Sequence, residues 1–184
     1  MSVEPLPYPD PALNDGRIGL RRWREEDIDC IRLAATDPEI PKGTTVPASY
    51  TSDEGLAFIH RQWGRADNGE GVSQAIVEID SDRAIGLMWV ALRPQTHVGG
   101  LGYWIVPPQR GQGAATAAMN LVVPWAFDVF DLRRLEAWVE PGNLASQRVL
   151  RRAGFQEEGR LRNFLTIDGR SADALVFSLI APDR

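Results

Sequence analysis

Gly111 and Gly113 belong to a short turn between a strand-like run and a helix-like run. The run Gly102–Val106 ends at two prolines, the turn follows, and apolar residues at helical spacing begin at Ala114. The first N–H groups of a helix have no partner within it, so they converge on an anion at its N-terminus. Glycine lets the backbone approach such an anion with no Cβ in between. The stretch therefore predicts a phosphate-binding turn.

Two common phosphate-binding loops do not match this turn. A P-loop places a lysine and a serine or threonine directly after its last glycine, whereas Ala114 and Ala115 follow Gly113 here. The dinucleotide fingerprint needs three glycines in a parallel βαβ unit near the start of a domain, whereas this turn is preceded by strands that form a hairpin. The pattern that remains is Arg-x-x-Gly-x-Ala, at Arg110, Gly113 and Ala115.

A second group of polar residues opens a later helix. The side chain of Asn143 can cap this helix, and Ser146 stands three residues further on. Arg148, Arg151 and Arg152 follow on the same helix and can supply positive charge to a phosphate ligand. Such a row of arginines is equally typical of a solvated helix face, and capping alone can account for the two residues at its start.

The elements that hold these residues follow from hydrophobic periodicity and turn residues. Residues 80–83 are a tight turn, so the strands on either side should form an antiparallel hairpin. Ser52 is expected to cap the second helix. Pro124 removes a hydrogen bond to the carbonyl of Asn120, which predicts a kink or a helix in two pieces. The predicted strands are 18–23, 73–79, 84–92, 100–106, 135–139, 155–163 and 174–179, and the predicted helices are 27–35, 52–68, 114–130 and 143–153.

This order predicts a single α/β (α+β) domain with a mixed, mostly antiparallel sheet of about seven strands flanked by helices. Residues 1–16 contain prolines at positions 5, 7, 9 and 11 and are predicted to be an extended arm, so the domain itself covers 17–184. Residues 41–50, rich in proline, glycine and threonine, are expected to be a loop that shapes the mouth of a site.

Composition restricts the classes of function. The 184 residues carry a net charge of −5, which argues against nucleic acid as the main partner. Cys30 is the single cysteine and only two histidines occur, so an internal disulfide is excluded and a metal site is not expected. No apolar run reaches the length of a membrane span, and the N-terminus does not match a signal peptide. These features indicate a cytoplasmic protein that does not insert into a membrane.

Several segments together resemble one known family. They are Arg110 to Ala115, the preceding Gly102-Tyr103-Trp104-Ile105-Val106-Pro107, the strand Arg134 to Val139, the run Asn143 to Leu150 with Ala153-Gly154-Phe155, and near the start Leu20 to Asp27 and Ala34 to Pro38. This set resembles the GCN5-related N-acetyltransferases (GNAT), in the RimJ/RimL-like branch. The resemblance covers nearly everything after residue 17.

The resemblance implies an enzyme that moves acetyl from acetyl-CoA to a primary amine, with no metal. The strand that ends at Val106 would splay from its neighbour, and the gap would admit the pantetheine arm. The backbone of Ile105 and Val106 would bind this arm and help to polarise the thioester carbonyl. Asn143 would orient the arm, and Ser146 would protonate the departing thiolate. The pyrophosphate would lie on Arg110, Gly111, Gln112, Gly113, Ala114 and Ala115, with Arg148 and Arg151 supplying further charge.

The catalytic base is where the sequence departs from the family pattern. Relatives often carry an acid just before the Gly-Tyr-Trp motif, but residues 99–101 here are Gly-Gly-Leu. A catalytic glutamate proposed for RimL-like enzymes would fall near Leu165, which cannot accept a proton. Glu136 remains as the candidate base, with Glu78 and Asp80 as weaker choices, and Trp138 could face the same cleft.

Three functions stay open at this point. The first is acetyl transfer, by direct attack of the amine since Cys30 lies far from the motifs, to an α-amino group of a protein or peptide or to a small amine. The second is a catalytically weak or inactive GNAT module that binds CoA. The third is transfer of a larger acyl group such as succinyl. A homodimer is common in the family.

Overall fold

The computed structural model describes residues 4–182, which form one eight-stranded sheet with helices on both faces. The strands lie in the order β1-β2-β3-β4-β5-β6-β8-β7, and every neighbouring pair is antiparallel except β5 and β6. The strands are β1 Leu13–Asn14, β2 Ile18–Arg22, β3 Gly71–Glu78, β4 Arg83–Leu92, β5 Val98–Ile105, β6 Arg134–Val139, β7 Gln156–Ile167 and β8 Arg170–Ile180.

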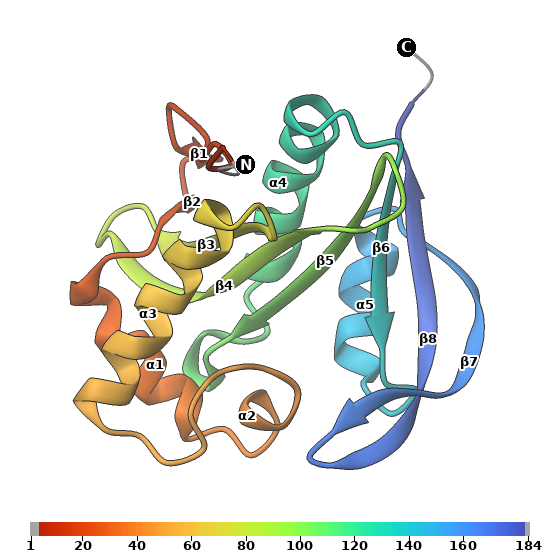
Figure 1. Ribbon diagram of the computed structural model, residues 1–184. Coiled ribbons are helices and arrows are strands. Elements are labelled where there is room, and N and C mark those ends of the chain that lie inside the picture. The colour runs from red at the N-terminus through yellow and green to blue at the C-terminus, as the bar shows by residue number, and fades with distance from the viewer. Residues whose placement is uncertain (1–3, 183–184) are drawn as a thin grey trace.

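The helices divide between the two faces of the sheet (Figure 1). Helices α1 and α3 cover one face over β3 and β4, while α4 packs on the other face and α5 lies beside it against β6. The helices are α1 Ile28–Ala35, α2 Ile40–Gly43, α3 Ser52–Asp67, α4 Ala114–Val129 and α5 Leu144–Arg152, with 3₁₀ turns η1 Glu25–Asp27 and η2 Pro107–Gln109. None of the helices in the described residues is long and apolar enough to cross a membrane.

The mixed, mostly antiparallel architecture predicted from the sequence is confirmed, with local differences. The eighth strand is β1, whose two residues are too few to leave a hydrophobic pattern and which pairs with β2. Thr51, not Ser52, caps α3, because its side chain accepts the N–H of Glu54 at 3.2 Å. Helix α4 continues through Pro124 as one element, so the two-piece alternative is wrong.

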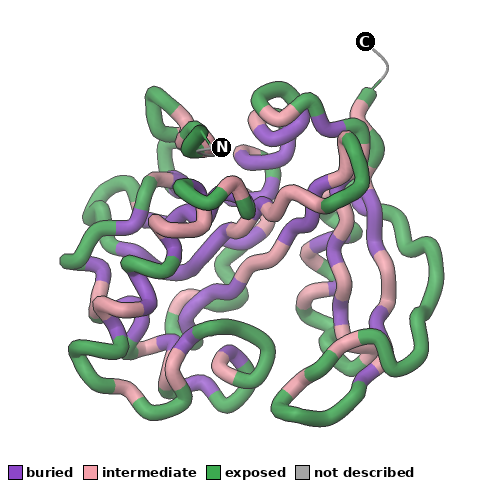
Figure 2. Tube along the Cα trace, in the orientation of Figure 1, coloured by how far each residue is buried: buried purple, intermediate pink, exposed green. Residues whose placement is uncertain are grey.

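The core lies where α4 packs on the sheet and where α1 and α3 cover β2–β5. Met88 of β4 and Met119 of α4 have no exposed surface, and Trp23, Phe58 and Trp104 form a cluster of rings on the opposite face. The β7 edge is different, because most of its residues are exposed along the right-hand side of Figure 2. The buried half of the sheet is therefore a rigid support for the ends of β4, β5 and β6.

Strands β5 and β6 separate soon after they meet. Their parallel pairing covers only three residue pairs, of which the last joins Gly100 to Glu136. Beyond that point β5 remains paired with β4 up to Ile105, while β6 remains paired with β8 up to Val139. The two strands diverge in Figure 1, with α4 and α5 behind them. This is the splay that the family resemblance predicted.

The N-terminal segment lies against the domain in its described part. Residues 1–3 of the predicted arm fall outside the described residues. The N–H of Leu6 donates to the carbonyl of Ala66 at the end of α3, and β1 extends the sheet by one short strand.

Candidate active site

The gap between β5 and β6 is bordered by backbone groups of β5 that do not pair with β6. Successive strand residues direct their N–H and C=O groups to alternate sides. The N–H of Val106 donates to Ile85 on the β4 side at 2.9 Å, so the groups of Leu101, Tyr103 and Ile105 face the gap. The carbonyl of Ile105 accepts Nε of Arg110 at 3.0 Å. Of the two residues predicted to bind a pantetheine arm, Ile105 keeps its N–H on the gap side, and Val106 does not.

The predicted phosphate turn has the backbone that its glycines suggested. Gly111 and Gly113 adopt φ values of 77° and 79°, in the left-handed region that favours glycine. Gly113 is the N-cap of α4 and provides no side chain to bind the first N–H groups of that helix. Gln112 is exposed between the two glycines, and Ala114 and Ala115 begin the helix with small side chains. The turn therefore combines free helix N–H groups with room for an anion.

Arg110 serves as a brace for this turn in the structure. Its Nη1 lies 2.7 Å from Oδ2 of Asp37, a carboxylate that is only 5% exposed. Oδ1 of the same carboxylate accepts the N–H groups of Glu39 and Ile40. Burial acts to raise the pKa of Asp37, but Arg110 and the two backbone donors outweigh it and hold the pKa below its usual value. Arg110 thus joins the turn to the end of β5 and to the segment after α1.

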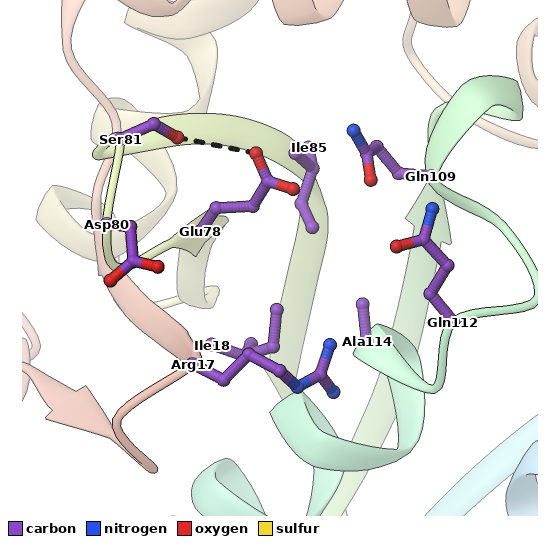
Figure 3. A pocket seen from close by; sticks show the side chains of 9 residues that line it. All are labelled: Arg17, Ile18, Glu78, Asp80, Ser81, Ile85, Gln109, Gln112 and Ala114. Atoms are coloured by element: carbon purple, nitrogen blue, oxygen red, sulfur yellow. Dashed lines mark hydrogen bonds between the residues drawn. The ribbon is translucent and has the colours of Figure 1, made fainter.

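A pocket beside α4 is lined by Arg17, a positively charged side chain that the sequence analysis did not single out. The cavity, of about 300 Å³, lies between the β3–β4 turn, the start of β2 and the first turn of α4. Figure 3 shows the guanidinium of Arg17 directed toward Ala114, with Gln109 and Gln112 on the far side. A Cβ at Gly113 would lie 3.9 Å from Nη2 of Arg17. No local motif marks Arg17, since only tertiary pairing of β2 brings it to the turn.

Glu78 and Asp80, the weaker candidates for a base, lie on the opposite wall of this pocket (Figure 3). Glu78 accepts hydrogen bonds from Arg83 at 2.8 Å and from the hydroxyl of Ser81 at 3.3 Å. The two acids are therefore grouped with the phosphate turn and not with the point where β5 and β6 separate.

Helix α5 presents the second predicted group. Oδ1 of Asn143 accepts the N–H of Ser146 at 3.0 Å, so Asn143 caps the helix as expected. The side chain of Gln147 is buried and donates to the carbonyl of Pro141 at 2.8 Å, which fixes the turn before the helix. The hydroxyl of Ser146 takes no part in the cap and is left free for another role.

Tyr103 is a neighbour of Ser146 that sequence reasoning missed. It projects from β5 on the face covered by α4 and α5, and its hydroxyl is buried with no hydrogen-bond partner among the described residues. Burial raises the pKa of Tyr103, and the nearby Ser146 acts in the opposite direction without reaching hydrogen-bond geometry. A buried hydroxyl without a partner is unusual, because buried polar groups are nearly always satisfied.

The arginines of α5 differ in what they contact. Arg151 pairs with Glu157 at 2.7 Å and lies over the ring of Phe177, so its charge is directed toward β7 and β8. Arg148 and Arg152 are exposed and form no ion pair with any residue in the range 4–182. Of Arg148 and Arg151, both predicted to supply charge to the phosphate, Arg148 is consequently the one without an ion pair among the described residues.

Glu136 stands at the point of separation, on the sheet face that α4 and α5 do not cover. Its Oε1 accepts Nε of Arg134 at 2.7 Å, while Oε2 has no partner within the described chain. Arg134 also pairs with Glu158, which accepts the hydroxyl of Ser178 at 2.7 Å. Arg134 and then Ser178 lower the pKa of Glu158 to about 2. The group is a fixed network with one free carboxylate oxygen at its end.

A second pocket opens beside Glu136. It has a volume of about 360 Å³ and is lined by the β4–β5 turn, β6 and Phe164 of β7. Trp138 lines this pocket, and its ring packs edge-to-face against that of Phe164 with the ring centroids 4.7 Å apart. The turn between β7 and β8 contacts residues 41–50, where the N–H of Asp168 donates to the carbonyl of Lys42 at 3.3 Å. The segment predicted as a loop therefore includes α2 and contacts the β7–β8 turn.

Comparison with known proteins connects this geometry to a family. Residues 17–156 match the family model described as an acetyltransferase (GNAT) domain. The chain belongs to the GNAT acetyltransferases.

Proteins that are similar to this chain over most of its length support this assignment. "Probable N-acetyltransferase YjcK" of Bacillus subtilis (strain 168) is 36% identical over 136 residues, which are 73% of this chain and 75% of the relative. "Uncharacterized N-acetyltransferase YoaA" of the same organism is 27% identical over 173 residues, or 94% of this chain and 98% of the relative. The protein is accordingly an acyl-CoA-dependent N-acetyltransferase of the RimJ/RimL-like branch.

Solved structures share the fold. Mycobacterium smegmatis RimJ, in complex with CoA-disulfide, superposes with a TM-score of 0.79 at 24% identity, over 92% of this chain and 86% of that one. The microcin C7 self-immunity acetyltransferase MccE, in complex with acetyl-CoA and AMP, gives 0.79 at 21% identity, over 91% and 94%. At these identities the likeness establishes the fold.

Proposed function

We propose that this protein transfers acetyl from acetyl-CoA directly to an α-amino group, carried by a protein, a peptide or a small amine. The observation that supports this most is the separation of β5 and β6 after Gly100 and Glu136, next to the uncapped start of α4. In this proposal residues 17–184 form the acyltransferase domain and residues 1–16 are its N-terminal arm.

In this proposal the CoA part of acetyl-CoA is bound mainly by backbone groups. The N–H groups from Gly111 to Ala115 would bind the pyrophosphate, with Arg148 and Arg17 supplying charge that the acidic chain otherwise lacks. The gap-facing N–H of Ile105 and the backbone of Tyr103 would bind the pantetheine arm. Arg110 would contribute by keeping the turn in place, since its guanidinium is already paired with Asp37.

The reaction needs two proton transfers, and the two groups proposed for them lie on opposite faces of the sheet. The amine nitrogen attacks the thioester carbonyl carbon, the C–S bond breaks, and the sulfur accepts a proton. Ser146, supported by the neighbouring Tyr103 hydroxyl, is the proposed donor to sulfur on the face of α5. Glu136, through its free Oε2, is the proposed acceptor of the amine proton on the other face.

Cys30 supports direct transfer over an acyl-cysteine route. It lies within α1 and is 3% exposed, and burial raises the pKa of its thiol far above the usual value. A nucleophilic cysteine needs its thiolate and access to the substrate, and Cys30 has neither.

An α-amine suits a site with a single, partly engaged carboxylate. The pKa of an α-amino group is about 8, against about 10.4 for lysine, so roughly a tenth of it is already neutral at pH 7. Less base strength is then required of Glu136, one oxygen of which is held by Arg134.

Release of CoA from acetyl-CoA tests the proposal with two peptides of one sequence. One carries a free N-terminus and an acetylated lysine side chain, and the other an acetylated N-terminus and a free lysine. We expect faster turnover of the α-amine peptide at pH 7, with the difference narrowing as the pH rises. Faster turnover of the lysine peptide at pH 7 would contradict α-amine transfer.

A further inference from the structure

The pocket beside Glu136 contains one charged group that the rest of the protein does not neutralise. Arg134 is fully engaged, by Glu136 on one side and Glu158 on the other. Arg93, at the end of β4, forms no ion pair with any described residue, and its Nε is buried without an acceptor. Burial lowers the pKa of Arg93, against the influence of Glu136, which raises it. A partly buried guanidinium without an ion pair can bind an anionic ligand.

The position of Arg93 is set by the rings and strands around it. Its guanidinium carbon lies 3.8 Å from the centroid of Trp138, on β6. A Cβ at Gly100 would come within 2.7 Å of Nε and Nη2 of Arg93. Gly100 is the last β5 residue paired with β6, so glycine there makes room for the cation at the point where the strands separate. Residues 99–101, where the family pattern has an acid, thus leave space for the side chain of Arg93.

We propose that Arg93 binds the carboxylate of the acceptor and that the acceptor is a free α-amino acid. This proposal rests on the α-amine transfer proposed above and specifies its substrate class. A zwitterionic amino acid carries its carboxylate and amine on one carbon, and the pocket offers Arg93 to the first and the free Oε2 of Glu136 to the second. A planar guanidinium can bind a carboxylate through two parallel hydrogen bonds.

The size and walls of the pocket agree with an amino acid. Its volume of about 360 Å³ is at the small end of the range for ligand sites, about 300–1,000 Å³. Trp138, Phe164, Val98 and Pro94 supply apolar surface for a hydrophobic side chain. We therefore choose L-phenylalanine as the test acceptor.

The experiment measures CoA release with L-phenylalanine, L-phenylalaninamide and a tripeptide that begins with phenylalanine. The amide and the peptide lack the carboxylate beside the amine, although their amines are more often neutral at pH 7. We expect kcat/KM for the amino acid to exceed both by at least about tenfold, the effect of roughly 1.4 kcal/mol. A further peptide, beginning with aspartate, tests whether a side-chain carboxylate is the preferred source.

Arg93→Gln tests the residue itself. We expect a loss of about 30- to 100-fold for L-phenylalanine, mainly in KM, and less than a threefold change for the amide, because only the amino acid uses the cation. Arg93→Lys keeps the charge but not the planar fork and should fall in between. Arg22→Gln is the matched control, because Arg22 also lies over a tryptophan, Trp63, but lines neither pocket.

The outcomes separate the two proposals. Turnover of the tripeptide at the rate of the amino acid, or an equal loss for all acceptors in Arg93→Gln, would overturn the amino-acid proposal and leave α-amine transfer intact. Preference for the aspartate peptide over the amino acid would likewise overturn it. If no amine is acetylated, α-amine transfer fails, and calorimetry with L-phenylalanine in the presence of CoA decides about Arg93: binding that the glutamine variant loses supports the site, and no binding rejects it.

Discussion

Asp37 and Arg110 connect the segment after α1 to the predicted phosphate turn through an ion pair of 2.7 Å. Asp37 is nearly inaccessible, whereas Arg110 is about half exposed at 48%. Since Arg110 also donates to the carbonyl of Ile105, the pair holds three separate parts of the chain together. The arginine of the Arg-x-x-Gly-x-Ala pattern thus has a structural role within the protein, as the partner of a buried carboxylate, whether or not it also binds a ligand.

Asp37→Asn should separate the ion pair from the capping role of this side chain. The amide oxygen can still accept the N–H groups of Glu39 and Ile40, but the pair with Arg110 is lost. We expect unfolding free energy to fall by about 1–2 kcal/mol, because Arg110 is partly solvated. We expect KM for acetyl-CoA to rise about 3- to 10-fold, the effect of roughly 1 kcal/mol.

Chemical denaturation and steady-state kinetics measure these two effects. The pKa of Asp37 is lowered in the folded state, so the stability difference should be full near neutral pH, begin to shrink as the pH falls below about 4, and vanish only below the lowered folded-state pKa. Asp29→Asn is the control, because Asp29 forms an exposed pair with Arg32 on α1 and should change neither quantity. An unchanged KM in Asp37→Asn would show that Arg110 does not position the turn.

Two substitutions of Asn143 distinguish its role as a helix cap from a role in binding the anionic CoA. Asn143→Ala removes the acceptor for the N–H of Ser146 and should cost about 1 kcal/mol in unfolding free energy. Asn143→Asp keeps an acceptor and should retain the stability of the native protein, since acids are good N-caps. Its new negative charge should nonetheless raise KM for acetyl-CoA about tenfold, the effect of roughly 1.4 kcal/mol. Unaltered kinetics in a stable Asn143→Asp variant would place Asn143 away from CoA.

The fold could be predicted because it follows from local signals. Alternation of apolar residues gave seven strands, and the turn at 80–83 paired β3 with β4 in the expected antiparallel sense. The differences also have local causes: β1 has two residues, and Thr51 and Ser52 are adjacent residues that can both cap. Helix α4 contains Pro124 because packing against the sheet on its buried face outweighs one lost hydrogen bond.

The backbone of the turn at 110–113 could be predicted from the sequence, but the side chains of the second pocket could not. Gly111 and Gly113 adopt positive φ values, a conformation that their residue type favours and that the sequence therefore indicates. Arg93 carries no such signal, because its role comes from the pairing of Leu92 with Gly99, which brings it over the strand separation. The hydroxyl of Tyr103 is significant only because tertiary packing leaves it without a partner. Motif spacing reports on residues that are close in the sequence, whereas the surroundings of Arg93 and Tyr103 come from residues that are distant in the sequence and are brought together by the fold.

Ser146 and Tyr103 can be distinguished as proton donors to the departing sulfur. Ser146→Ala removes a hydroxyl that takes no part in the helix cap, so we expect unchanged folding and a fall in kcat of about 100-fold. Tyr103→Phe removes a buried hydroxyl without a partner, so unfolding free energy should stay within about 1 kcal/mol or rise. If the serine is the donor, kcat should fall less in Tyr103→Phe than in Ser146→Ala. The reverse order would assign the proton to the tyrosine.

Glu158 should make stability depend on pH in the acid range. Its folded-state pKa of about 2 lies below the value of about 4.3 for an unfolded glutamate, so its pair with Arg134 stabilises the fold above pH 5. That contribution is lost as the pH falls from about 4.3 to about 2. Because the carboxylate is 43% exposed, we expect Glu158→Gln to cost less than about 1 kcal/mol at pH 7.

Denaturation of both proteins between pH 7 and pH 2.5 tests this prediction for Glu158. The difference in unfolding free energy between wild type and Glu158→Gln should close as the pH falls, because protonation removes the charge that the variant lacks at every pH. Ser178→Ala provides a smaller version of the same change, since it removes one donor to Glu158 and leaves Arg134 in place. A difference that stays constant down to pH 2.5 would mean that packing, and not the charge of Glu158, accounts for the loss.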